Sequence, residues 1–227
     1  MALRADNNGE GGILALYALL RKMKRKWIYL LAIIGASTLL ADGIITPAIT
    51  VTTAIEGLES ISPHLPVIPI TLGIITIIFF VQRFGTESIG KSFGVFMLIW
   101  FLLLGVTGAF SITSYPMILK AINPYYAIVL LAQSPEWFLI LGAVFLCTTG
   151  AEALYSDLGH CGRKNITISW LFVKAMLILN YLGQGAWVLN HIQTASSVNP
   201  FFSIMPQSML IFAIIMATGA AIVASQA

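Results

Sequence analysis

Polar residues inside the first long apolar run are the most informative feature of this chain of 227 residues. Asp42 is the only acidic or basic residue between Trp27 and Ile55, a run long enough to cross a bilayer as a helix. A carboxylate at the centre of a membrane helix costs about 2.5–3.5 kcal/mol even on lenient insertion scales. We therefore expect Asp42 to have a functional partner, and a bound cation is the simplest candidate.

Threonines recur on the side of this predicted helix that carries Asp42. Residues four apart lie on one helical face with about 40° of drift per step, which makes the polar stripe about 120° wide. Hydroxyl and carboxylate oxygens suit alkali and alkaline-earth cations. Pro47 cannot donate to the carbonyl of Gly43, so that oxygen is released near the level of Asp42. The stripe consists of Thr38, Asp42, Thr46, Thr50 and Thr53.

The alternative for the threonines is that each donates to the preceding helical turn, as threonine often does in membrane helices. For the threonines alone the two interpretations are evenly balanced. Because Asp42 shares their face, the pattern favours a cation site.

A second acidic residue, Glu152, interrupts the fourth apolar run, and Thr149 lies one turn before it. Gly150 is a natural place for a helix to unwind. Broken helices that expose carbonyls beside acidic side chains are typical of ion sites in transporters. The alternative is that Glu152 lies deep in the cytoplasmic half of its helix, paired with a basic group.

The composition indicates an integral membrane protein, since 58% of the residues are hydrophobic and only 9% are charged, against about 25% charged in soluble domains. The apolar runs are continuous rather than alternating, which predicts an all-α protein. A net charge of +3 is too small to indicate a nucleic-acid partner. Neither a nucleophile–base pair nor a phosphate- or dinucleotide-binding fingerprint is present, so we expect no enzyme, no catalytic residue and no cofactor. The polar, basic first 26 residues do not resemble a secretory signal.

Charge alternates from loop to loop along the chain. Basic residues gather before the first run and around residues 82–91 and 157–165, and the positive-inside rule places these segments in the cytoplasm. We predict a short surface helix around Pro124–Leu131. The spacing Gly90-x-x-x-Gly94 fits a close helix contact, but this pattern is common. The expected organisation is a cytoplasmic segment at 1–26 and a multi-pass transmembrane domain at 27–227. Its six predicted spans are about 27–55, 67–81, 92–111, 137–156, 166–189 and 207–224.

Several segments together resemble the KUP/HAK/KT family of potassium transporters. The matches run in order from one end of the chain to the other, and several exceed eight residues. They are Arg4-Ala5-Asp6-Asn7-Asn8-Gly9-Glu10-Gly11-Gly12, Ala41-Asp42-Gly43-Ile44-Ile45-Thr46-Pro47-Ala48-Ile49-Thr50, Gln82-Arg83-Phe84-Gly85-Thr86, Asn123-Pro124-Tyr125-Tyr126, Gly150-Ala151-Glu152-Ala153-Leu154-Tyr155-Ser156-Asp157-Leu158-Gly159-His160 and Asn180-Tyr181-Leu182-Gly183-Gln184-Gly185-Ala186.

This resemblance implies a core of twelve helices with an inverted repeat, of the LeuT-like amino acid–polyamine–organocation type, that takes up potassium with protons. The six spans would be its third to eighth helices. The family's potassium ligands on the third helix would fall on Asp42, Thr46 and Thr50, and those on the broken sixth helix on Thr149 and Glu152. Glu152 is also the candidate for the coupling proton, because a low dielectric disfavours an uncompensated carboxylate. No metal other than potassium is expected.

The chain also departs from the family pattern. The family's first helix, with its Gly-Asp-Ile-Gly-Thr-Ser signature and its own site aspartate, is absent, and Thr50 stands where serine is usual. We therefore expect a truncated chain, and the sequence leaves open whether it is active alone. The expected partners are potassium, protons, the lipid bilayer of the plasma membrane (the inner membrane if bacterial) and, for the full-length protein, a second copy in a homodimer. The alternatives are an organic-cation or amino-acid permease of the same fold and a non-transporting membrane fragment.

Overall fold

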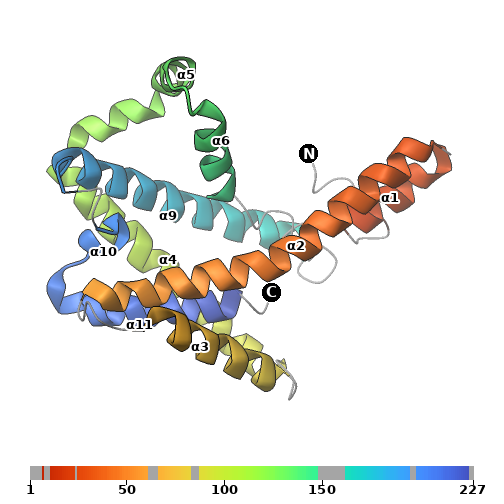
Figure 1. The fold of residues 1–227 in the computed structure, drawn as a ribbon, viewed down its shortest axis with the longest axis horizontal. Coiled ribbons are helices and arrows are strands. Elements are labelled where there is room, and N and C mark those ends of the chain that lie inside the picture. Colours follow the sequence, from red (N-terminus) through yellow and green to blue (C-terminus); the bar gives the residue numbers. More distant parts are fainter. Residues whose placement is uncertain are drawn as a thin grey trace. The chain divides into compact units, whose positions relative to one another are not determined.

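The structure is a computed structural model that describes residues 7, 11–23, 25–60, 66–82, 87–147, 162–194 and 198–224. Regular structure in these residues is almost entirely helical (Figure 1). The chain divides into two compact units, one formed by Met1–Leu40 with Leu119–Phe172 and the other by Ala41–Ile118 with Val173–Ala227. Two long helices, α2 (Lys26–Glu56) and α9 (Arg163–Asn190), contribute residues to both units.

The first unit contains mostly short helices. The helix predicted around Pro124–Leu131 is confirmed as α5, which begins with Pro124 in its first turn, where a missing N–H is harmless. The side chain of Asn123 caps this helix by accepting a hydrogen bond of 3.0 Å from the backbone N–H of Tyr125. The other elements of the unit are α1 (Ile13–Leu20), η2 (Arg21–Met23), most of η4 (Pro116–Ile122), α5 (Pro124–Gln133) and α6 (Trp137–Leu146).

The second unit has an apolar core in which α2, α3 (Val67–Gln82) and α11 (Leu210–Ala224) meet. Val51 of α2 is fully buried there, and the rings of Trp100 and Phe201 pack beside the core at 5.8 Å between centroids. The buried members are Val51, Ala54, Ile55, Val67, Ala217 and Ala221. The remaining elements of the unit are η3 (Gly57–Ser60), α4 (Glu87–Ser114), α10 (Pro200–Ser203) and η5 (Gln207–Met209).

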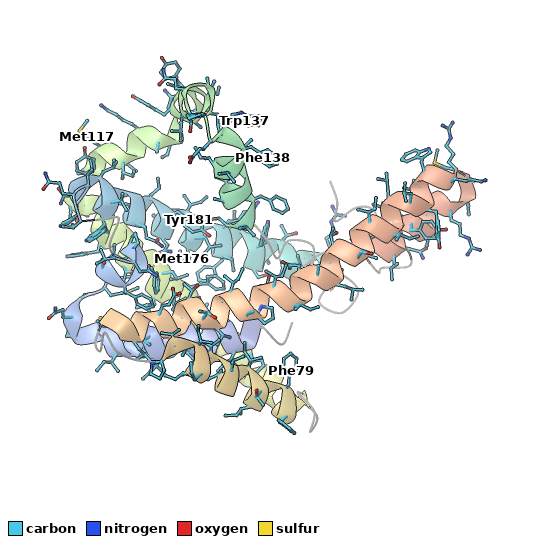
Figure 2. All side chains as sticks on the ribbon, viewed as in Figure 1. Phe79, Met117, Trp137, Phe138, Met176 and Tyr181 are labelled. Carbon is cyan, nitrogen blue, oxygen red and sulfur yellow. The ribbon has the colours of Figure 1, made fainter. Side chains whose placement is uncertain are left out.

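Helices α4 and α9 approach each other closely within the second unit. A Cβ built on Gly183 would come within 2.5 Å of the Cα of Gly108, so both positions require the absence of a side chain. The hydroxyl of Ser111 donates a hydrogen bond of 2.8 Å across this contact to the carbonyl of Gly183. Met176, labelled in Figure 2, packs against Gly105 one turn earlier on α4.

The common spacing Gly90-x-x-x-Gly94 marks no close contact at Gly94, because a Cβ there would meet no atom of the described residues within 4 Å. Small residues four apart permit close packing but do not specify it. The glycines of α4 that make close contacts, Gly105 and Gly108, lie further along the helix, where α9 packs against it.

Four helices of the described residues are long and apolar enough to cross a membrane: Lys26–Glu56, Phe93–Ser114, Arg163–Asn190 and Gln207–Ala224. The predicted spans at 67–81 and 137–156 correspond to the shorter apolar helices α3 and α6. Residues 148–161, which include the end of the predicted fourth span, lie outside the described residues.

Large apolar side chains remain exposed on the helices of both units. Phe79 is 64% exposed and Phe138 is 72% exposed (Figure 2). A soluble domain rarely exposes so many large apolar groups, whereas a bilayer covers them. The helices, their apolar composition and this surface identify an all-α membrane protein that crosses the bilayer several times.

Candidate functional site

The acidic residue singled out from the sequence lies in the middle of α2, paired with a threonine of the next turn. The hydroxyl of Thr46 donates a hydrogen bond of 2.7 Å to Oδ1 of Asp42, and both residues are half-buried. A hydroxyl has one proton and two lone pairs. Because the proton of Thr46 is directed at the carboxylate, its oxygen lone pairs remain available to a cation beside Asp42.

The next threonine of the stripe bonds within its own helix. Thr50 donates to the carbonyl of Thr46 at 2.8 Å and lies 3.3 Å from the carbonyl of Pro47. Thr38 likewise donates to the carbonyl of Gly35 at 2.9 Å. Back-bonding, the alternative considered for all the threonines, thus describes Thr38 and Thr50, while Thr46 pairs with the carboxylate.

The backbone beside Asp42 is open. Pro47 lies inside α2 without ending the helix, and its nitrogen has no hydrogen to give to the carbonyl of Gly43. A Cβ added at Gly43 would meet no atom of the described residues within 4 Å. A carbonyl without its helical donor, a carboxylate and a hydroxyl therefore lie within one turn of the same helix.

The polar stripe faces away from the apolar core of the second unit. Val51, the most buried core residue of α2, lies nine residues after Asp42, which is a rotation of about 180° around the helix. One face of α2 therefore packs against α3 and α11, while the opposite face presents Asp42 and Thr46 to other neighbours. Packing and any binding by the polar stripe therefore use different faces of α2.

The other two predicted ligands, Thr149 and Glu152, lie outside the described residues. The structure therefore pairs Asp42 with Thr46 and places Thr50 one turn beyond Thr46 on the same helix, and the site as a whole, with its opposing wall, stays a prediction.

Two polar features escaped the sequence reasoning. One is the hydrogen bond between Ser111 of α4 and Gly183 of α9. The sequence contains Gly108 and Gly183 but does not indicate that their two helices are neighbours. The other is a pocket where α1, η2 and the start of α2 meet, lined in part by Tyr17, Arg21 and Tyr29. The sequence signal for this pocket is the basic run before the first span, which by itself predicts only the orientation of the chain.

Comparison with known proteins gives a match over the whole chain. The family described as "K+ potassium transporter integral membrane domain" matches residues 1–227. No solved structure matches the chain.

Curated relatives align with every part of the chain. A protein of Flavobacterium psychrophilum named "Probable potassium transport system protein Kup" is 52% identical over 233 residues, and its counterpart in Latilactobacillus sakei is 56% identical over 243 residues. The alignments cover 100% of this chain but only 36% and 35% of these relatives, so the chain spans about a third of their length. With a family match from the first residue to the last, the chain belongs to the K+ potassium transporter integral membrane domain family.

Proposed function

We propose that this chain forms part of a transporter that takes up potassium ions together with protons. The observation that carries the proposal is the bond between Thr46 and Asp42, which sets a carboxylate and a hydroxyl oxygen together on the face of α2 opposite the core. The names of the relatives support potassium as the cargo, since each is called a potassium transport system protein.

The chemistry of the stripe suits a monovalent cation. Potassium loses its hydration shell in a binding site and needs oxygen dipoles to replace it. In our proposal Asp42 balances the charge, while the hydroxyl oxygens of Thr46 and Thr50 replace hydration oxygens. A single carboxylate provides the one negative charge that a monovalent ion requires.

The second wall of the proposed site consists of Thr149 and Glu152. Glu152 also takes the coupling proton in this scheme, because an uncompensated carboxylate is unfavourable in a low dielectric and a proton or a cation removes that penalty. We further propose that the segment belongs to a LeuT-like core of twelve helices with an inverted repeat, with the remaining helices supplied by parts of the fold that this chain does not span.

The proposed location is the plasma membrane, or the inner membrane of a bacterium, with residues 1–26 in the cytoplasm. Five basic residues precede the first span at positions 21–26, and the rule of basic cytoplasmic loops supports that orientation. The proposed assembly is a homodimer of the full-length transporter.

The test is potassium uptake in cells that lack their own potassium transporters. We would express the chain alone and also a chimera in which it replaces the aligned segment of the Flavobacterium psychrophilum relative. The chimera should restore uptake. Asp42→Asn in the chimera should reduce the initial rate at low potassium by a hundredfold or more, since removing one member of a buried ion pair costs about 3–5 kcal/mol.

Glu56→Gln provides a matched control, because Glu56 is an exposed carboxylate at the last residue of the same helix. Its uptake should equal that of the parent chimera. Undiminished uptake with Asp42→Asn would refute the site while leaving the family unaffected. Transport of an amino acid or organic cation instead of potassium would favour a permease, and stable insertion without any flux would favour a non-transporting membrane protein.

The proton coupling is tested separately with Glu152→Gln. This variant should still take up potassium, with weaker binding because a proposed ligand has lost its charge, but should lose the stimulation of uptake by an inward proton gradient. If the gradient stimulates Glu152→Gln as strongly as the parent, the coupling proton is carried elsewhere.

A further inference from the structure

Helix α1 folds back on the start of α2 to form an antiparallel hairpin. The rings of Tyr17 and Tyr29 lie 6.1 Å apart between centroids, and the side chain of Ile13 packs beside Gly35, where an added Cβ would come within 3.2 Å of it. Later residues of α1 thus pair with earlier residues of α2. The tip of the hairpin lies between η2 and the start of α2, where Arg21, Arg25 and Lys26 belong to the basic run.

A pocket of about 210 Å³ opens at this tip. Its volume is smaller than the about 300–1,000 Å³ of sites that enclose drug-sized ligands, so it suits a compact group. The three cationic side chains that line it form no ion pair with any residue that the structure describes, and all three are exposed. The polar lining consists of Tyr17, Arg21, Arg25, Lys26 and Tyr29.

The length of α2 gives the depth of this pocket in a bilayer. At 1.5 Å per residue, Lys26 lies about 22 Å along the helix from its midpoint near Ala41. The hydrocarbon core of a bilayer extends about 15 Å from the midplane, and the headgroups reach about 20–22 Å. A helix centred in the membrane therefore places the basic tip among the phosphate groups of the lipids.

The rest of the hairpin suits the same position. The sequence of α1 is Ile-Leu-Ala-Leu-Tyr-Ala-Leu-Leu, and the side chain of Leu14 is 70% exposed. Trp27, beside the pocket, is 54% exposed, and tryptophan and tyrosine prefer the membrane interface. The exposed leucines of α1, next to the basic tip, therefore suit contact with lipid at the cytoplasmic interface of the membrane.

We propose that this tip binds the headgroup of an anionic phospholipid. Arginine guanidinium groups match the paired oxygens of a phosphate, Lys26 adds a third positive charge, and the hydroxyls of Tyr17 and Tyr29 can donate to further oxygens. A phospholipid matches both the basic pocket and the apolar surface of α1. Its phosphate can enter the pocket while its acyl chains cover the leucines of α1. The inference concerns a site separate from the stripe on α2 and does not depend on the cargo.

The test is retention of lipid by the purified full chain in native mass spectrometry. The protein in neutral detergent is mixed with equal amounts of phosphatidylglycerol and phosphatidylcholine. The chain should retain phosphatidylglycerol preferentially. Arg21→Gln with Arg25→Gln should weaken that retention about fivefold for each charge removed. Arg21→Lys with Arg25→Lys keeps the charge and should retain most of the binding, which also shows that the hairpin tolerates substitution at these positions.

The matched control is Arg163→Gln with Lys164→Gln, which removes two basic residues at the start of α9, outside the pocket. Its lipid preference should equal that of the unchanged chain. The helical signal in circular dichroism identifies any variant that fails to fold. If the glutamine double variant fails to fold, the unchanged chain is compared with Arg21→Lys and Arg25→Lys instead. Equal loss in the control pair, no preference between the two lipids, or displacement of the lipid by millimolar inorganic phosphate would each overturn the proposal.

Discussion

The hydroxyl of Thr46 donates to the carboxylate of Asp42 across 2.7 Å, one helical turn apart on α2. This bond orients the carboxylate along the helix and directs the hydroxyl proton away from any cation that approaches from the side. The pair lies on the face opposite Val51, so the packing of the core and the polar stripe do not compete for the same residues.

Thr46→Val should impair potassium uptake without disturbing the core of the second unit. Valine has the same shape but cannot donate to Asp42, and a hydrogen bond to a charged group contributes about 1.5–3 kcal/mol, which corresponds to a rise in KM of about tenfold or more. Thr46→Ser keeps the hydroxyl and should remain close to the parent. Uptake kinetics of the chimera with the Flavobacterium psychrophilum relative provide the measurement; equal KM values for the valine and serine variants would exclude a role for the hydroxyl.

Pro47→Ala should weaken potassium binding while making α2 more regular. Alanine restores an N–H that can donate to the carbonyl of Gly43, and that carbonyl is then less available to a cation. The expected result is a several-fold higher KM for potassium together with a higher melting temperature of the purified protein, because proline inside a helix costs about 3 kcal/mol. A higher melting temperature with an unchanged KM would show that the Gly43 carbonyl takes no part in binding.

Some of this arrangement follows from the sequence alone, because it depends on a single helix. The regular spacing of Asp42 and Thr46 predicts a shared face, and α2 extends one residue beyond each end of the predicted range 27–55. The capped helix after Asn123 is likewise encoded locally, by a proline in the first turn and an amide before it.

Contacts between helices could not be predicted in the same way. The glycines at 90 and 94 have the familiar spacing, yet the close approach occurs between Gly108 and Gly183, which are far apart in the chain. Which helices become neighbours depends on the whole fold, and a single sequence does not report it. For the same reason the sequence offers Thr149 and Glu152 as ligands without placing them opposite Asp42.

Gly183→Ala should destabilise the packing of α4 against α9. The new Cβ would lie 2.5 Å from the Cα of Gly108, and since the clash is with backbone the helices must separate. Overpacking of this kind costs about 1–3 kcal/mol, which a thermal unfolding measurement in detergent can detect as a lower melting temperature. Gly73→Ala is the control, because a Cβ there meets nothing within 4 Å, and it should leave the melting temperature unchanged or raise it. Equal effects of the two substitutions would contradict the close approach.

Thr71→Val should stabilise the second unit. Thr71 on α3 is buried, and its hydroxyl oxygen has no hydrogen-bond partner among the residues that the structure describes. Burying an unpaired hydroxyl costs about 1–3 kcal/mol, and valine has nearly the same shape without that group. Thr107→Val is the matched control, since Thr107 is also buried but donates to the carbonyl of Leu103 at 2.7 Å. The melting temperature should rise for Thr71→Val and stay level or fall for Thr107→Val. A fall for Thr71→Val would mean that its hydroxyl bonds in the complete fold, and would direct attention to α3 as a contact surface for the helices that this chain does not span.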